Sequence, residues 1–232
     1  PRADLHVQGG AAGEHEVRLD GMPIRNPVTL RRLLGAFSPL ALDRLTVHKA
    51  GFGVEHGSTI SGVLSAEHAL SASRPSVGRV TVDPMSVNAE SHGSVPLGEH
   101  RTAQFRVAAR SSVWDLYQDP TLNRLLLDWN GVDPMLLSSY FGGAAVPEID
   151  PVAQTATVGF SDLHAATRID LGPYRSLSVS GYRGRNQLRT QFVARSPTGM
   201  LTQDRYDWAN TAGQARLDWA LGARLSASVQ LR

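Results

Sequence analysis

The sequence contains no cysteine, a single lysine and no long apolar run. Without cysteine there is no disulfide framework, no thiolate zinc site and no cysteine nucleophile. No stretch approaches the ~18 consecutive apolar residues that a membrane-spanning helix needs. Apart from Lys49, the positive charge is arginine spread along the chain, and the net charge is only +2. Nucleic-acid-binding proteins more often concentrate basic side chains on one face, so we expect no nucleic-acid partner.

The chain has 232 residues, of which 41% are apolar and 19% charged. This composition is typical of a folded chain with a sizeable core, in one large domain or two small ones. The sequence begins at Pro1 without an initiator methionine or a signal peptide, and it ends at Arg232 within a strand-like pattern. We therefore expect it to be a piece of a longer protein.

The first 70 residues combine short strand-like runs with many tight turns. Alternating apolar residues predict strands at 5–8, 16–19, 45–48 and 60–64. Asp20-Gly21 and Asn26-Pro27 are turn signals. A helical spacing predicts two helical turns that stop near Ser38-Pro39. The apolar residues with this spacing are Leu30, Leu33, Leu34 and Phe37. These features predict a small α+β unit.

From residue 77 onward, the alternation of apolar and polar residues becomes persistent. The clearest segments run from Phe105 to Ala109, Leu163 to Leu171, Leu177 to Gly181, Thr211 to Leu221 and Leu225 to Leu231. They predict strands of about 9–11 residues, with one apolar face and one face rich in Arg, Asp, Gln and Ser. The turns between them are short, as at Gly172-Pro173. This pattern favours a transmembrane β-barrel, in which Trp208 and Trp219 could belong to an aromatic girdle.

Two alternatives stay open at this point. A soluble antiparallel sandwich also alternates, although its strands are usually ~5–6 residues long. Such a fold would be a soluble β-rich module that binds carbohydrate or another ligand. A hydrolase would need convergent Ser, His and Asp side chains, and Ser161 lies on the opposite strand face from Asp162 and His164. The segment from about 111 to 150 breaks the alternation and is expected to be a loop on the outside of the barrel.

Five motifs occur in order in the first 67 residues. They are Val7-Gln8-Gly9-Gly10, Val17 to Ile24, Asn26-Pro27, Phe37-Ser38-Pro39 with Leu45 to Phe52, and Glu55 to Leu64. Together they resemble the plug domain of TonB-dependent outer-membrane receptors. The Asn-Pro after the hairpin and the form Lys49-Ala50-Gly51-Phe52 look most like the branch whose members carry a carboxypeptidase-regulatory-like domain ahead of the plug. Phe160 to His164 and the paired strands after it resemble the first barrel strands of that branch.

The resemblance implies a mainly β protein, with a small α+β plug at 1–70 and the first strands of an incomplete transmembrane β-barrel at 77–232. It also implies a bacterial outer-membrane transporter that takes up a scarce nutrient of the siderophore, cobalamin or oligosaccharide class. Outer-membrane lipid and a TonB-type energy-transducing protein would be its partners, and the TonB box is absent from this sequence. A complete transporter barrel has about 22 strands.

Candidate site residues follow from the same resemblance. Substrate contacts are expected in plug loops at Arg25, Asn26, Phe52, Glu55 and His56. Ion pairs between plug and barrel are expected at Arg18, Asp20, Arg31, Arg32, Asp43 and Arg44. The eight histidines lack metal-ligand spacing, so we expect no metal site, no cofactor and no catalytic residues.

Overall fold

The computed structural model describes residues 7, 9–10, 14–25, 27–29, 34–49, 61–68, 70, 76–98, 101–114, 151–194, 200–221 and 225–232. Within these residues the protein is mainly β and its sheets are mostly antiparallel. None of the described segments forms a helix that is long and apolar enough to cross a membrane.

A small sheet of four strands has the order β2-β1-β6-β5. Its strands are β1 (Glu16–Leu19), β2 (Met22–Ile24), β5 (Arg44–His48) and β6 (Val63–Glu67). β1 and β6 are parallel, whereas the other neighbours are antiparallel. The β1–β2 turn has positive φ at Asp20 (50°) and Gly21 (85°). This conformation matches the Asp-Gly hairpin that the sequence predicted.

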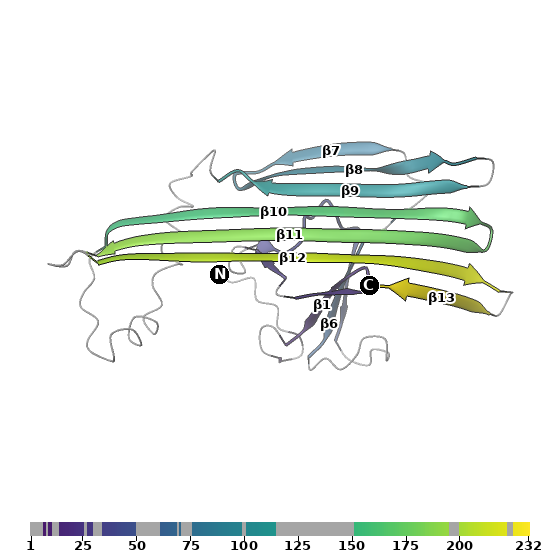
Figure 1. Cartoon of the computed structure of the whole chain (residues 1–232), viewed down its shortest axis with the longest axis horizontal. Helices are drawn as coiled ribbons and strands as arrows, with labels where there is room; N and C mark the ends of the chain where they lie inside the picture. Colours follow the sequence, from purple (N-terminus) through teal and green to yellow (C-terminus); the bar gives the residue numbers. More distant parts are fainter. Residues whose placement is uncertain are drawn as a thin grey trace.

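A large sheet of seven strands has the order β13-β12-β11-β10-β9-β8-β7. Its strands are β7 (Val77–Val82), β8 (Ser86–Pro96), β9 (Thr102–Ser112), β10 (Pro151–Gly172), β11 (Arg175–Ala194), β12 (Met200–Ala220) and β13 (Ser226–Leu231). Each pairs only with its sequence neighbours, and the three longest lie side by side along the molecule (Figure 1). The described sheet is open, with β7 and β13 at its edges.

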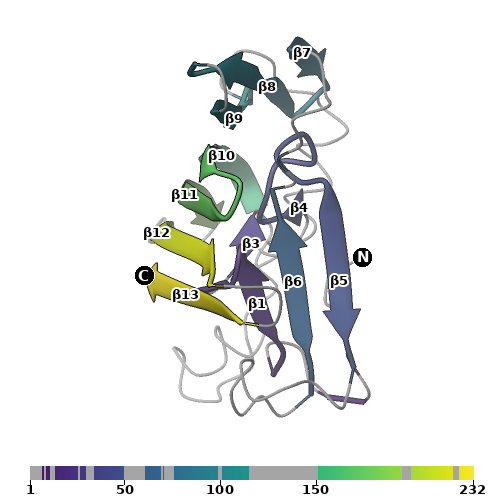
Figure 2. The same ribbon diagram turned by 90° about the vertical axis from the view of Figure 1, so that its right-hand side faces the viewer.

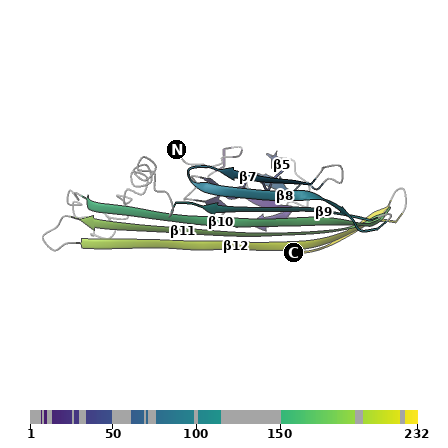
Figure 3. The same ribbon diagram turned by 90° about the horizontal axis from the view of Figure 1, so that it is seen from above.

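The small sheet lies against one face of the large sheet, which curves along it (Figures 2 and 3). We call this face of the large sheet its inner face, and the opposite face its outer face. The core lies between the two sheets: Leu19, Ile24 and Ala66 of the small sheet pack with Tyr182 of β11. Phe37 and Leu42 add to this cluster from the segment before β5.

Several strand predictions are confirmed, and their lengths are corrected. β1, β5 and β9 contain the predicted runs, whereas β6 begins three residues later than predicted, at Val63 rather than Ile60. β10, β11 and β12 have 22, 20 and 21 residues, about twice the expected length. On the outer face of β10, the residues before Leu163 are no longer apolar. The alternation in the sequence therefore predicted only about half of each long strand. β9 also extends to Ser112, which the sequence placed in the loop; residues 115–150 lie outside the described part.

The predicted helix before Ser38 is wrong over its described half. Leu34–Gly35 forms strand β4, which pairs with β3 (Val28–Thr29). Phe37 then follows in a bend. The helical spacing of apolar residues has another cause here, because Phe37 packs into the core between the sheets rather than onto a helix face. Leu30 and Leu33 lie outside the described residues.

Candidate functional site

The inner face of the large sheet is polar and is buried by the small sheet. Alternation along each strand places every second side chain on this face. The buried polar side chains of β8 to β11 include Asn88, Glu90, Gln104, Arg106, Arg110, Asp162, His164, Ser180 and Asn186. Buried charges are costly unless they are paired, so the partners of these groups define the candidate site.

Arg110 of β9 anchors the segment before β5 to the large sheet. Its Nε donates to Asp162 Oδ2 on β10 at 2.5 Å, and both side chains are at least 94% buried. Its Nη2 donates to the backbone carbonyls of Gly35 (3.2 Å) and Ala36 (3.3 Å), which precede β5. Below the guanidinium, the ring of Phe160 lies 5.1 Å away and provides a cation–π contact. One arginine therefore joins two strands of the large sheet to the segment before β5.

A chain of two histidines and two aspartates crosses from one sheet to the other. His68 Nδ1 lies 2.6 Å from Asp20 Oδ2, and the His68 backbone N–H donates to Asp20 Oδ1 at 2.9 Å. His68 Nε2 lies 3.1 Å from His164 Nδ1, and both imidazoles are fully buried. His164 Nε2 lies 3.4 Å from Asp162 Oδ1. The order is thus Asp20–His68–His164–Asp162, which ends on the anchor Arg110.

The last contact of this chain is incomplete. His164 Nε2 and Asp162 Oδ1 have no hydrogen-bond partner among the described residues. Two neutral imidazoles carry two N–H groups, but the chain has three contacts that each need one. With both rings neutral, one contact therefore lacks its hydrogen, which accounts for the unpartnered pair.

Asp20 is the acidic end of the chain on the small sheet. Burial raises the pKa of this carboxyl, but its hydrogen bonds to His68 and Ser180 and its electrostatic interaction with His68 lower it more. The net result is a pKa below the ordinary value of 3.8. The backbone carbonyl of Asp20 also accepts from Gln214 Nε2 of β12 at 2.7 Å. The β1–β2 turn is thus held by two strands of the large sheet, β11 through Ser180 and β12 through Gln214.

Aromatic rings pack around the two histidines. Phe37 contacts His164 and Tyr182 edge-on, with ring centroids 5.9 Å and 5.3 Å apart. Tyr182 also donates its hydroxyl to the carbonyl of Ala36 at 3.3 Å. A Cβ at Gly184 would overlap the Tyr182 hydroxyl, so glycine is needed there for this ring to lie flat along the strand. Phe37 and Tyr182 thus cover His164, which is fully buried.

A second set of polar contacts ties the segment 38–43 to β8 and β9. Arg106 Nη1 donates to Asp43 Oδ1 at 2.6 Å and to the carbonyl of Ala41 at 3.4 Å. Ser38 Oγ donates to Asn88 Oδ1 at 3.3 Å. We call the polar contacts described above, which run from Asn88 of β8 to Gln214 of β12, the seam between the sheets.

The residues predicted as ion-pair partners divide into three groups. Asp43 pairs with Arg106 across the seam, and Asp20 reaches the large sheet through His68 and Gln214. Arg18 pairs with Glu16 on its own strand at 3.0 Å, and Arg44 lies 3.7 Å from Glu67 of the adjacent strand. These two ion pairs therefore lie within the small sheet. Arg31 and Arg32 fall outside the described residues.

Most of the residues predicted to contact substrate lie outside the described part of the chain. Arg25 is exposed just after β2. Asn26, Phe52, Glu55 and His56 lie outside the described residues. Among the described residues, no group of three or more His, Asp or Glu side chains is arranged to hold a metal ion. A polar cavity of about 490 Å³ does lie between the sheets, next to the seam. Its lining includes Asp20, His68, Arg168, Ser180, Gln214 and Arg232.

Sequence reasoning missed His68, Arg106, Arg110 and Tyr182. The alternation placed Arg106, Arg110 and Tyr182 on the polar face, but a polar face alone does not show which partner covers it. His68 and His164 are 96 residues apart in sequence, and no local spacing brings them together. Only the pairing of the two sheets reveals them as one site.

Comparison with known proteins gives no further guidance. No protein-family model matches the sequence, and no curated protein matches it. The geometry above therefore carries the functional argument.

Proposed function

We propose that the chain is part of an outer-membrane TonB-dependent active transporter, in which the small sheet belongs to the plug and the large sheet to the barrel wall. One observation carries the proposal: the inner face of the large sheet buries many polar and charged side chains, whereas its outer face exposes a band of apolar ones. In a water-soluble sheet the polarity is normally the reverse. A wall that faces acyl chains outside and a polar lumen inside accounts for both faces.

The exposed apolar side chains form a continuous outer band. Paired rows of the ladder place Val107, Leu163, Val179 and Leu217 on this face. Leu163 is 50% exposed, Val179 41% and Val229 of β13 53%. On β10 the band runs from Leu163 to Leu171, which is about 27 Å along the strand. With the 35–45° tilt of barrel strands, the band would be roughly 21 Å high, close to the ~25 Å of known barrels.

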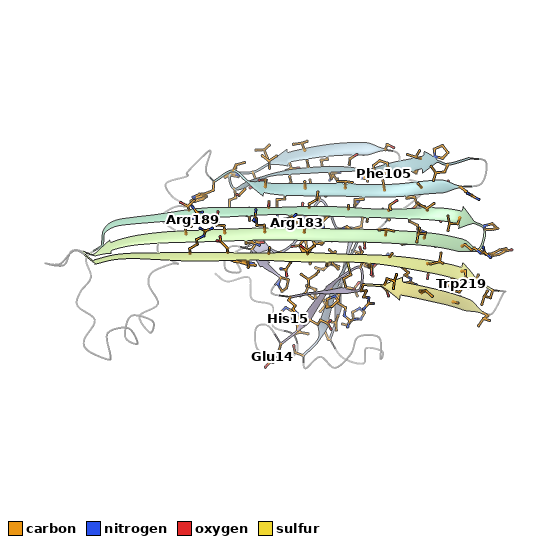
Figure 4. All side chains as sticks on the ribbon, in the orientation of Figure 1. Glu14, His15, Phe105, Arg183, Arg189 and Trp219 are labelled. Carbon is orange, nitrogen blue, oxygen red and sulfur yellow. The ribbon has the colours of Figure 1, made fainter. Side chains whose placement is uncertain are left out.

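The side chains at the two borders of the band differ from the aliphatic ones within it. Toward the turn between β10 and β11, Trp219 lies at its edge opposite Arg175 (Figure 4), and the exposed Tyr174 lies in the turn itself. Toward the other end, the outer face of β11 becomes cationic at Arg183, Arg185 and Arg189, all exposed. Trp208 lies in mid-strand opposite the buried Asn186, so it is not placed at a strand end as the sequence suggested. A band bordered in this way is typical of a strand that leaves the bilayer.

The seam supports the plug assignment. In the transporter family resembled by residues 5–67, the plug fills the lumen, and energy passed from a TonB-type protein rearranges it to open a path. A rearrangement of this kind needs contacts that are specific but polar. The seam has this character, because hydrogen bonds and an ion pair run along it from Asn88 to Gln214. The nutrient would be of the siderophore, cobalamin or oligosaccharide class.

The alternative of a soluble ligand-binding sandwich requires a second layer on the apolar face. Among the described residues, no strand packs on the outer side of Leu163, Val179 or Val229, which are all exposed. The exposed band therefore favours the transporter.

Adjacent residues of β11 provide a direct test of membrane embedding. Val179 faces outward and Ser180 is 7% exposed on the inner face. Because the chain has no cysteine, Val179→Cys and Ser180→Cys each give one site for a nitroxide label. In lipid vesicles, we expect the label at 179 to collide with oxygen dissolved in the bilayer, and the label at 180 to be shielded from it.

The proposal fails if both labels report an aqueous environment, or if the chain stays monodisperse and folded in plain buffer without lipid or detergent. A label in mid-bilayer at 180 rather than 179 would reverse the faces and contradict it as well.

Transport is tested in the native host. Removal of the gene is expected to abolish growth when one nutrient class is the limiting source: iron bound to a siderophore, cobalamin or an oligosaccharide. The gene carrying Val179→Ala, a small apolar replacement, serves as the control and is expected to restore growth. Unchanged growth on all three classes without the gene would contradict a role in their uptake.

A further inference from the structure

The cationic section of the outer face lies directly above the apolar band. In the strand ladder, Arg183 is opposite Leu163, the last large apolar residue of the band, and Arg185 is opposite Ser161. Residues opposite each other share a face, so both arginines point to the outside of the sheet. They lie two residues apart on one strand, about 7 Å along its axis. Arg183 and Arg189 are labelled on β11 in Figure 4.

Within the described part of the sheet, these arginines have no anionic partner. Neither Arg183 nor Arg185 forms a hydrogen bond or ion pair among the described residues, and both are exposed. The nearest carboxylate along this face, Asp207, is paired with Arg205 and also interacts with Arg189. Elsewhere on the large sheet, exposed arginines have such partners: Arg168 pairs with Asp170 and Arg216 with Asp218. The outer face above the band thus has an excess of positive charge.

We infer that Arg183 and Arg185 bind the phosphate groups of lipid headgroups in the leaflet at this end of the band. Guanidinium groups bind phosphate with paired N–H donors, and this pair lies at the height where the apolar band ends and headgroups begin. Continuity with the band identifies lipid rather than free phosphate as the occupant. Barrel turns are short on the periplasmic side, and the turn between β10 and β11 is short. The arginines therefore face the outer leaflet.

This inference rests on the proposed function, because it needs the band to lie in a bilayer. The test uses the full chain in phosphatidylcholine vesicles with or without phosphatidic acid. A fluorophore on Ser161→Cys, directly opposite Arg185, reports local lipid through quenching by phosphatidic acid or phosphatidylcholine that carries a nitroxide near the headgroup. We expect quenching by phosphatidic acid to exceed quenching by phosphatidylcholine severalfold. Because an arginine near an anionic surface contributes ~1 kcal/mol, or about fivefold, Arg183→Gln with Arg185→Gln should remove most of this preference.

The matched control removes two arginines from the inner face, as Arg168→Gln with Arg216→Gln, and is expected to keep the preference. High salt should weaken the preference of the unaltered chain. Equal quenching by both lipids, or a preference that survives loss of Arg183 and Arg185, overturns the inference while the nitroxide at Val179→Cys still reports acyl chains and the transporter proposal stands. A label at 179 that stays in water overturns both.

Discussion

Replacing Arg110 by methionine is expected to lower the free energy of unfolding by about 3–5 kcal/mol. The variant Arg110→Met leaves the Asp162 carboxylate, whose side chain is 2% exposed, without its 2.5 Å partner. It also removes the donor to the carbonyls of Gly35 and Ala36. The measurement is urea unfolding of the chain folded in detergent micelles, followed by tryptophan fluorescence.

The matched control is Arg216→Met. Arg216 pairs with Asp218 at 2.8 Å, but its side chain is 50% exposed. An exposed pair contributes ~0–1 kcal/mol, so this variant should unfold nearly as the unaltered chain does. The double variant Arg110→Met with Asp162→Leu removes the unpaired Asp162 carboxylate as well. Its loss of unfolding free energy should therefore be smaller than the sum of the two single losses by at least about 1 kcal/mol. Equal losses at Arg110 and Arg216 would show that the seam is not the anchor described above.

A positive charge in the middle of the outer band is expected to destabilise the chain in lipid by about 2–4 kcal/mol. Val179 is opposite Thr167, at the centre of the Leu163–Leu171 row, and is the position to change, as Val179→Arg. The same substitution on a water-exposed sheet surface would change stability by only about ±0.5 kcal/mol. The measurement is the folded fraction in phosphatidylcholine vesicles across a urea series.

Ser161→Arg is the control for that substitution. Ser161 is on the same face as Leu163, two residues farther along β10 and beyond the band, and it is exposed. Near the membrane interface an arginine costs ~0–1 kcal/mol. If Val179→Arg and Ser161→Arg have the same small effect in vesicles, the band does not lie in lipid and the transporter proposal is contradicted.

The alternation of residues predicted the large sheet well because strand faces depend on a local period of two. It correctly placed Asp162, His164 and Tyr182 on one face and Leu163 and Val179 on the other. It underestimated strand length, because above Leu163 the outer face carries Ser, Gly, Thr and Arg and no longer alternates in hydrophobicity. In that half, backbone pairing between β10, β11 and β12 continues without an apolar signal.

The small sheet was harder to predict because its elements are short. The hairpin at Asp20-Gly21 was predicted, since two residues of positive φ have a clear sequence preference. The helix expected to end at Phe37 was wrong, because tertiary packing of that ring against His164 and Tyr182 decided the local conformation. The partners in the seam, such as Asp20 with His68, depend on contacts between distant segments, which a single sequence does not encode locally.

The strands that carry the band continue far past it. β10 has 22 residues, or about 70 Å of hydrogen-bonded ladder, while the band occupies about 27 Å of that length. In the proposed setting, the part of these strands before Leu163 would extend the stiff sheet roughly 30 Å beyond the apolar band, on the outside of the membrane. A molecule arriving from outside would then meet the far end of these strands first, at a different height from the seam that it must later pass.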